Sequence, residues 1–145
     1  QVHITVHFIG DVQRRELEET IESVERSASG LPAFMLEARR LITLPERGPP
    51  RLVALETDLP STLLELHRRL VHRLARPARG SGKQRDRFLP HFTLCRFAHD
   101  VRAQGIDEPV TLEPIAVDHV SLMSSVLRPE GAQHQEIGRW MLEAR

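Results

Sequence analysis

The stretch HITV at residues 3–6 and the stretch HFTL at residues 91–94 share one pattern: histidine, apolar residue, threonine, apolar residue. Each begins a run in which apolar and polar residues alternate, and that alternation predicts a β-strand with its polar side chains on one face. The order of strands and helices around the two stretches also recurs. Two half-domains related by a rough two-fold axis would bring these strands side by side.

The remaining pattern predicts strands and helices in mixed order. The first strand, over residues 2–9, has Val2, Ile4, Val6 and Phe8 on its apolar face. Beyond it we expect two helices, one over 12–28 that ends near Gly30 and one from Ser61 to a point before Pro77. We expect strands over 34–44, 51–57, 91–97, 109–117 and 119–126, and a closing element of undecided type over 133–143. This order lacks a strict strand–helix–strand alternation, so it predicts an α+β fold with antiparallel sheets.

Length and composition narrow the class of protein. The chain has 145 residues, with 20 Lys and Arg against 20 Asp and Glu, which fits a single domain over residues 1–145. The lone Cys95 excludes an internal disulfide and a cysteine-cluster zinc site. No apolar run reaches the ~18 residues of a membrane span, and the opening residues lack the basic start of a signal peptide. We therefore expect a soluble, cytoplasmic, monomeric protein that does not act at a membrane.

Basic residues gather in one part of this neutral chain. Between His67 and Arg87 there are eight arginines and lysines and one acid, Asp86. A one-sided basic surface suits a ligand that carries phosphate. The competing interpretation is a solvated helix face followed by a loop.

The paired polar residues point to a particular chemistry. Strand alternation puts His3 and Thr5 on one face, and it does the same for His91 and Thr93. Two imidazoles can divide acid and base duty near neutral pH, because an unperturbed histidine titrates near 6.5. Threonine hydroxyls can donate hydrogen bonds to anionic oxygens. This set suits in-line displacement at a phosphodiester and needs neither a metal ion nor a cofactor.

Four segments resemble one enzyme family. HITVHFIGDV at residues 3–12 and FLPHFTLCRF at 88–97 are similar to the two histidine motifs of the RNA 2′,3′-cyclic phosphodiesterases, or LigT-like 2′-5′ RNA ligases, of the two-histidine (2H) phosphoesterase superfamily. RLVALE at 51–56 resembles, loosely, their strand between the halves, and VSLMSSVLRPEG at 120–131 resembles their late strand. The family has a strand and a helix before its first motif, and here only Gln1 and Val2 precede His3. From that difference we expect a sheet edge that the family covers to be open here.

The resemblance implies a bilobal, pseudo-two-fold α+β fold in which two antiparallel sheets form a central cleft with helices outside. It implies metal-independent opening of RNA 2′,3′-cyclic phosphate ends to 2′-phosphomonoesters, and some family members also join RNA ends through a 2′-5′ bond. On the matching positions, His91 is the base and His3 the acid. Thr5, Thr93 and Arg96 hold the phosphate, although strict alternation would put Arg96 on the face opposite His91.

Further residues are candidates for contact with RNA. His7 stands where the family usually has Arg or Lys, so we expect binding to strengthen as the pH falls. Phe88 is a candidate for stacking on a base, and Arg76, Arg79 and Lys83 are candidates for phosphate contacts. Cys95 is expected on the face of His91 as a small filler, and His67 and His72 are expected to be exposed on a helix.

Two other functions fit the same residues. One is a non-catalytic module that binds RNA ends or nucleotides, and the other is a 2H phosphodiesterase for a different cyclic phosphate. Turnover of a 2′,3′-cyclic nucleotide separates the enzyme from the binding module.

Overall fold

A computed structural model of the protein describes residues 2–75, 87–99 and 102–144. The chain forms two compact units, each assembled from separate segments. The first unit comprises Gln1–Val6, Met35–Pro60 and Ala78–Ile115, and the second comprises His7–Phe34, Ser61–Pro77 and Ala116–Arg145. Both His-x-Thr stretches therefore belong to the first unit.

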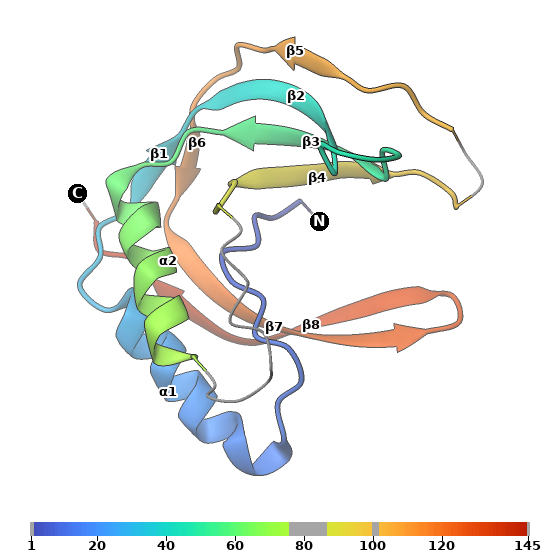
Figure 1. Ribbon diagram of the computed structural model, residues 1–145. Helices are drawn as coiled ribbons and strands as arrows, with labels where there is room; N and C mark the ends of the chain where they lie inside the picture. Colours follow the sequence, from blue (N-terminus) through green and yellow to red (C-terminus); the bar gives the residue numbers. More distant parts are fainter. Residues whose placement is uncertain (1, 76–86, 100–101, 145) are drawn as a thin grey trace. The chain divides into compact units, whose positions relative to one another are not determined.

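The first unit is built on an antiparallel sheet of four strands in the order β4-β3-β2-β5 (Figure 1). Its strands are β2 (Ala38–Leu44), β3 (Leu52–Thr57), β4 (His91–Arg96) and β5 (Asp107–Pro109). Ile42, Val53 and Leu55 are buried in this sheet, and Ala54 is fully buried. Asp58 closes the end of β3 by accepting a hydrogen bond from the Glu37 amide at 2.8 Å, and its own amide donates to the Glu37 carbonyl.

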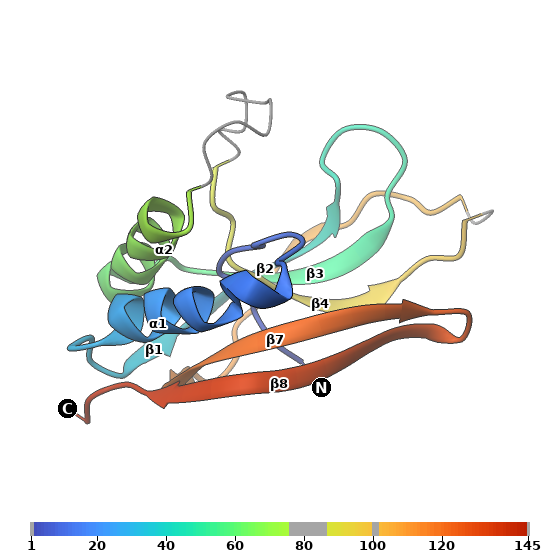
Figure 2. The same ribbon diagram turned by 90° about the horizontal axis from the view of Figure 1, so that it is seen from below.

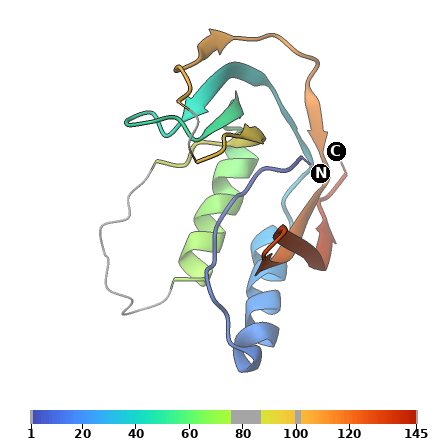
Figure 3. The same ribbon diagram turned by 90° about the vertical axis from the view of Figure 1, so that its right-hand side faces the viewer.

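The second unit contains both α-helices and a long hairpin. A 3₁₀ turn η1 (Arg14–Glu16) leads into α1 (Leu17–Ala28), which contacts α2 (Ser61–Arg73) on one side. On its other side α1 packs on the antiparallel strands β7 (His119–Arg128) and β8 (Gly131–Met141) (Figures 2 and 3). Leu63, Leu66 and Leu70 of α2 are buried at helical spacing, as an amphipathic helix requires.

Most expected elements are confirmed, and the closing element is a strand, β8. The expectation of one strand over 109–117 is wrong. The structure instead has β5 and, after an interval, β6 (Ile115–Val117), which pairs with β1 (Phe34–Leu36). Val110 still donates a hydrogen bond to the Arg39 carbonyl at 3.0 Å, and Pro114 just before β6 lacks the amide hydrogen that a ladder needs. Glu37 likewise separates β1 from β2, because its backbone pairs with Asp58.

The fold class is α+β with antiparallel sheets. Within the described part of the chain, neither helix is long and apolar enough to span a membrane.

Candidate active site

The N-terminal segment meets β4 at one point. Ile4 forms an isolated antiparallel bridge with Phe92, and the segment runs beside β4 in Figure 1. In an antiparallel pair the residues that flank a bridge lie across from each other, so His3 stands beside Thr93 and Thr5 beside His91. All four residues therefore share the face opposite Ile4 and Phe92. The structure brings together the two pairs that the sequence pattern singles out.

The expected strand over residues 2–9 is largely absent. Beyond the bridge at Ile4 the segment bends at Val6, and the alternation shifts by one residue. His7 and Ile9 become half-buried, while Phe8 is 82% exposed. The predicted apolar face thus holds at Ile4 and Val6 and fails at Val2 and Phe8, because a period of two persists only while the backbone stays straight.

The strand β3 completes the floor of this face. Ala54 pairs with Thr93 and Glu56 pairs with His91, and cross-strand partners in a sheet point to the same side. Ala54 is fully buried and small, so it fills the space below the polar residues. Glu56 is half-buried and places a carboxylate directly across from His91.

A β-bulge decides where the end of β4 points. Ala54 pairs with Thr93 and Val53 with Cys95, so Leu94 is an extra residue without a partner. One inserted residue reverses the alternation beyond it. Arg96, which pairs with Leu52, therefore returns to the face of His91 and Thr93, whereas Cys95 turns to the opposite face. The expectation that Cys95 shares the face of His91 is wrong, and the obstacle to a phosphate contact by Arg96 disappears.

A backbone contact orients the His91 ring. Its Nδ1 lies 2.7 Å from the Leu89 carbonyl oxygen. Because a carbonyl only accepts hydrogen bonds, Nδ1 carries the hydrogen and Nε2 is the atom left for proton transfer. His91 is half-buried and His3 is exposed, so the two imidazoles differ in their surroundings.

His7 lies next to another histidine in the second unit. Burial lowers the pKa of His7, and repulsion from His67 lowers that pKa further. His67 is half-buried and not exposed as expected, whereas His72 is exposed. His7 therefore stays neutral to a lower pH than an ordinary histidine, and any gain in RNA affinity from its charge requires more acid than the sequence suggests.

We expect His7 to make the protein less stable in acid. Its pKa is lower in the folded protein than in the unfolded chain, so protons favour unfolding. Its contribution to stability is complete above about pH 6.5 and is lost as the pH falls through the lower pKa of the folded protein.

The His7→Gln variant should lose less stability than the wild type between about pH 7 and pH 5, as measured by urea unfolding. His99→Gln, at an exposed histidine, is the matched control and should keep the wild-type pH dependence. An unchanged pH dependence in His7→Gln would contradict this assignment.

The remaining candidates for RNA contact divide into two groups. Phe88 is half-buried and belongs to the first unit. Arg76, Arg79 and Lys83 lie outside the described residues. Among the residues that the structure does describe, no group of three or more His, Cys, Asp or Glu side chains is arranged to hold a metal ion.

Glu56 is the residue of this face that sequence reasoning missed. Its oxygens can accept hydrogen bonds from an imidazolium or a sugar hydroxyl. The available signal was a single acid within the apolar run LVALET at residues 52–57. That signal shows that Glu56 is unusual, but it does not reveal that His91 is the partner.

Comparisons with known proteins identify the family of this chain. The sequence model of the 2′-5′ RNA ligase superfamily matches residues 1–127. The chain belongs to this superfamily. It is 26% identical over 133 residues to a Thermotoga maritima protein named RNA 2′,3′-cyclic phosphodiesterase, and the match covers 90% of the chain and 70% of that protein.

Solved structures of similar proteins share the fold. A protein of Thermus thermophilus matches with a TM-score of 0.81 at 24% identity, over 99% of this chain and 79% of that one. LigT of E. coli in complex with 3′-AMP matches with a TM-score of 0.69 at 24% identity, over 98% of this chain and 76% of LigT. The recognition of a LigT-like 2H phosphoesterase from its sequence motifs is confirmed.

Proposed function

We propose that this protein hydrolyses RNA 2′,3′-cyclic phosphate ends to 2′-phosphomonoesters, with His3 and His91 as its acid–base pair. The observation that carries the proposal is the Ile4–Phe92 bridge, because its register sets His3 and Thr5 beside Thr93 and His91. The name of the Thermotoga maritima relative supports the same reaction. The noncontiguous first unit, which joins segments from three parts of the chain, supports one catalytic domain over residues 1–145.

The reaction requires one group that removes a proton from water and another that donates a proton to the leaving 3′ oxygen. Nε2 of His91 removes a proton from water, and the water oxygen forms a bond to phosphorus. The bond from phosphorus to the 3′ oxygen breaks in line with the attack, and His3 donates a proton to that oxygen. The phosphate remains on the 2′ oxygen.

The other polar residues of this face stabilise the negative charge that develops on the phosphate oxygens during the reaction. The hydroxyls of Thr5 and Thr93 and the guanidinium of Arg96 donate hydrogen bonds to the non-bridging oxygens. When an RNA 5′-hydroxyl replaces the water, the same displacement joins two RNA ends through a 2′-5′ bond.

Product analysis tests the proposed activity. We expect 2′,3′-cyclic AMP to be converted to 2′-AMP at the same rate with and without EDTA, as measured by chromatography. Formation of 3′-AMP alone would contradict the proposed direction of cleavage. Binding without any turnover would favour the non-catalytic module.

A further inference from the structure

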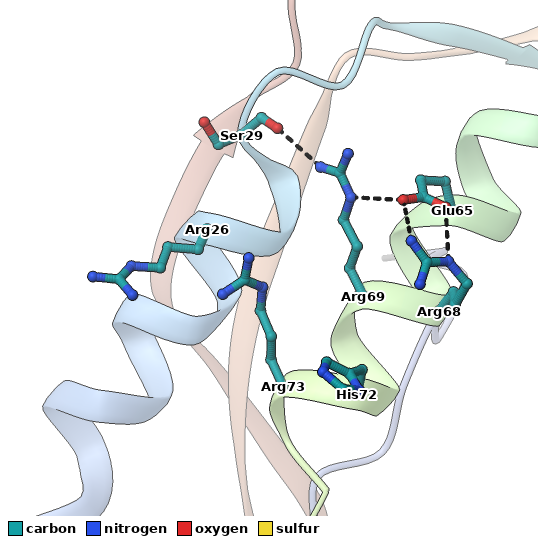
Figure 4. Close-up of a pocket in the computed structure, with 7 residues that line it drawn as sticks. All are labelled: Arg26, Ser29, Glu65, Arg68, Arg69, His72 and Arg73. Carbon is teal, nitrogen blue, oxygen red and sulfur yellow. Dashed lines mark hydrogen bonds and ion pairs between the residues drawn. The ribbon is translucent and has the colours of Figure 1, made fainter.

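A second concentration of charge lies within the second unit. A pocket of about 620 Å³ opens between the C-terminal halves of α1 and α2 (Figure 4). Its lining consists of Arg26, Ser29, Glu65, Arg68, Arg69, His72 and Arg73. Four arginines thus face one carboxylate within the pocket, and the proposed reaction at the His-x-Thr face does not use them.

Hydrogen bonds hold the side chains of Glu65 and Arg69 in place at this pocket. Glu65 accepts hydrogen bonds from Arg68 at 2.6 Å and 2.9 Å and from Arg69 at 2.9 Å. These bonds, from Arg68 first and then Arg69, lower the pKa of Glu65 to about 2, so its carboxylate stays charged. Arg69 also donates to the carbonyl oxygens of Ser27 and Ser29, and it thereby links α2 to the end of α1.

The other arginines leave positive charge in excess. Arg26 pairs with Glu22 along α1 at 2.5 Å. Within the part of the chain that the structure describes, Arg73 has no side-chain hydrogen bond or ion pair, and its side chain extends from α2 towards α1 (Figure 4). With Glu22 counted, four guanidiniums still face only two carboxylates. His72 would add a further charge when it is protonated.

Helix ends offer a competing explanation for these residues. Cations in the last turn of a helix interact favourably with the partial negative charge at its C-terminus. Arg26 lies in the last turn of α1, and His72 and Arg73 lie in the last turn of α2. The dipole does not account for the grouping of Arg26, Arg68, Arg69 and Arg73 around one open pocket. It also makes a different experimental prediction, which concerns stability alone.

We propose that this pocket binds backbone phosphates of the RNA substrate. The inference rests on the proposed function for the identity of the polyanion. The chemistry suits it, since guanidiniums bind phosphate oxygens through paired hydrogen bonds. A pocket of this size also lies within the usual range for small-ligand sites, roughly 300–1,000 Å³.

Salt dependence of binding tests this inference. The probe is a short, labelled single-stranded RNA with a 3′-hydroxyl end, which contains no cyclic phosphate to open. The test variant is Arg26→Gln/Arg73→Gln, with Arg73→Gln alone as a milder change. The control is Arg14→Gln/Arg15→Gln, which removes the same charge at exposed positions of η1 in the same unit. Fluorescence anisotropy gives the affinity at several salt concentrations.

The test variant should bind the RNA more weakly, and its salt slope should fall in magnitude by about 0.7 for each phosphate that the pocket no longer binds. The control should keep the wild-type slope. Turnover of 2′,3′-cyclic AMP, measured on the same samples, should be unchanged in both, because a mononucleotide has no further phosphates to place in the pocket. A lower melting temperature with an unchanged slope would overturn the inference in favour of the helix dipole. Absent turnover in the wild type would instead count against the proposed function and leave the slope comparison valid.

Discussion

Replacing His91 with alanine should reduce turnover of a 2′,3′-cyclic nucleotide by about 10²–10⁴-fold, and His3→Ala should have an effect of similar size. In the proposed mechanism the two imidazoles act in one displacement, one taking a proton and the other giving one. The double variant should therefore be little worse than either single variant. Steady-state kinetics on 2′,3′-cyclic AMP measures all three. His99→Ala, at an exposed histidine of the first unit, is the matched control and should be as active as the wild type.

The same variants test which of the two histidines acts as the acid and which acts as the base. A substrate with a good leaving group at the 3′ position needs no proton from the enzyme. His3→Ala should be largely rescued on that substrate, whereas His91→Ala should not. The reverse pattern would exchange the two roles, and rescue of neither would indicate that the histidines only bind phosphate.

Replacing Arg96 with alanine should lower kcat by about 10²-fold or more, the usual cost of removing one donor from a developing oxyanion. The neighbouring Cys95→Ala variant is the control and should keep nearly full activity. The bulge at Leu94 predicts this contrast, because it returns Arg96 to the face of His91 and turns Cys95 away.

Arg96→Lys extends this test. It retains the charge but loses the paired hydrogen bonds of a guanidinium, so its activity should fall between that of the wild type and that of Arg96→Ala. Equal losses in Arg96→Ala and Cys95→Ala would contradict the role of the bulge. Full activity in Arg96→Ala would show that the threonines hold the phosphate without it.

Local pattern predicts the elements of this fold well where neighbouring residues alone decide them. The apolar stripe of α2 and the glycine after α1 predict both helices to within a few residues. The pattern fails where a distant segment intervenes. Asp58 interrupts the strand at Glu37 by the hydrogen bonds that its carboxylate and its amide form with the Glu37 backbone, which no local pattern reveals.

In the candidate site, too, local pattern predicts some features, and distant segments decide others. The repeated His-x-Thr pattern is enough to select His3, Thr5, His91 and Thr93 as a set, since alternation fixes which neighbours share a face. It assigns Cys95 to the wrong face, because alternation carries no information about an inserted residue. The structure shows the insertion directly, because β4 pairs with β3 on both sides of Leu94, whose side chain is 49% exposed.

By itself the sequence determined the residue types of the candidate site, the family and the periodicity of the helices, because these depend on residues close together in the chain. Only the tertiary structure decided which groups meet. It set Glu56 across from His91, returned Arg96 to the same face, and brought His67 close enough to His7 to lower its pKa. Each of these depends on strand register or burial between distant segments. Register and burial are properties of the packed chain, and a single residue slip reverses which side chains face each other.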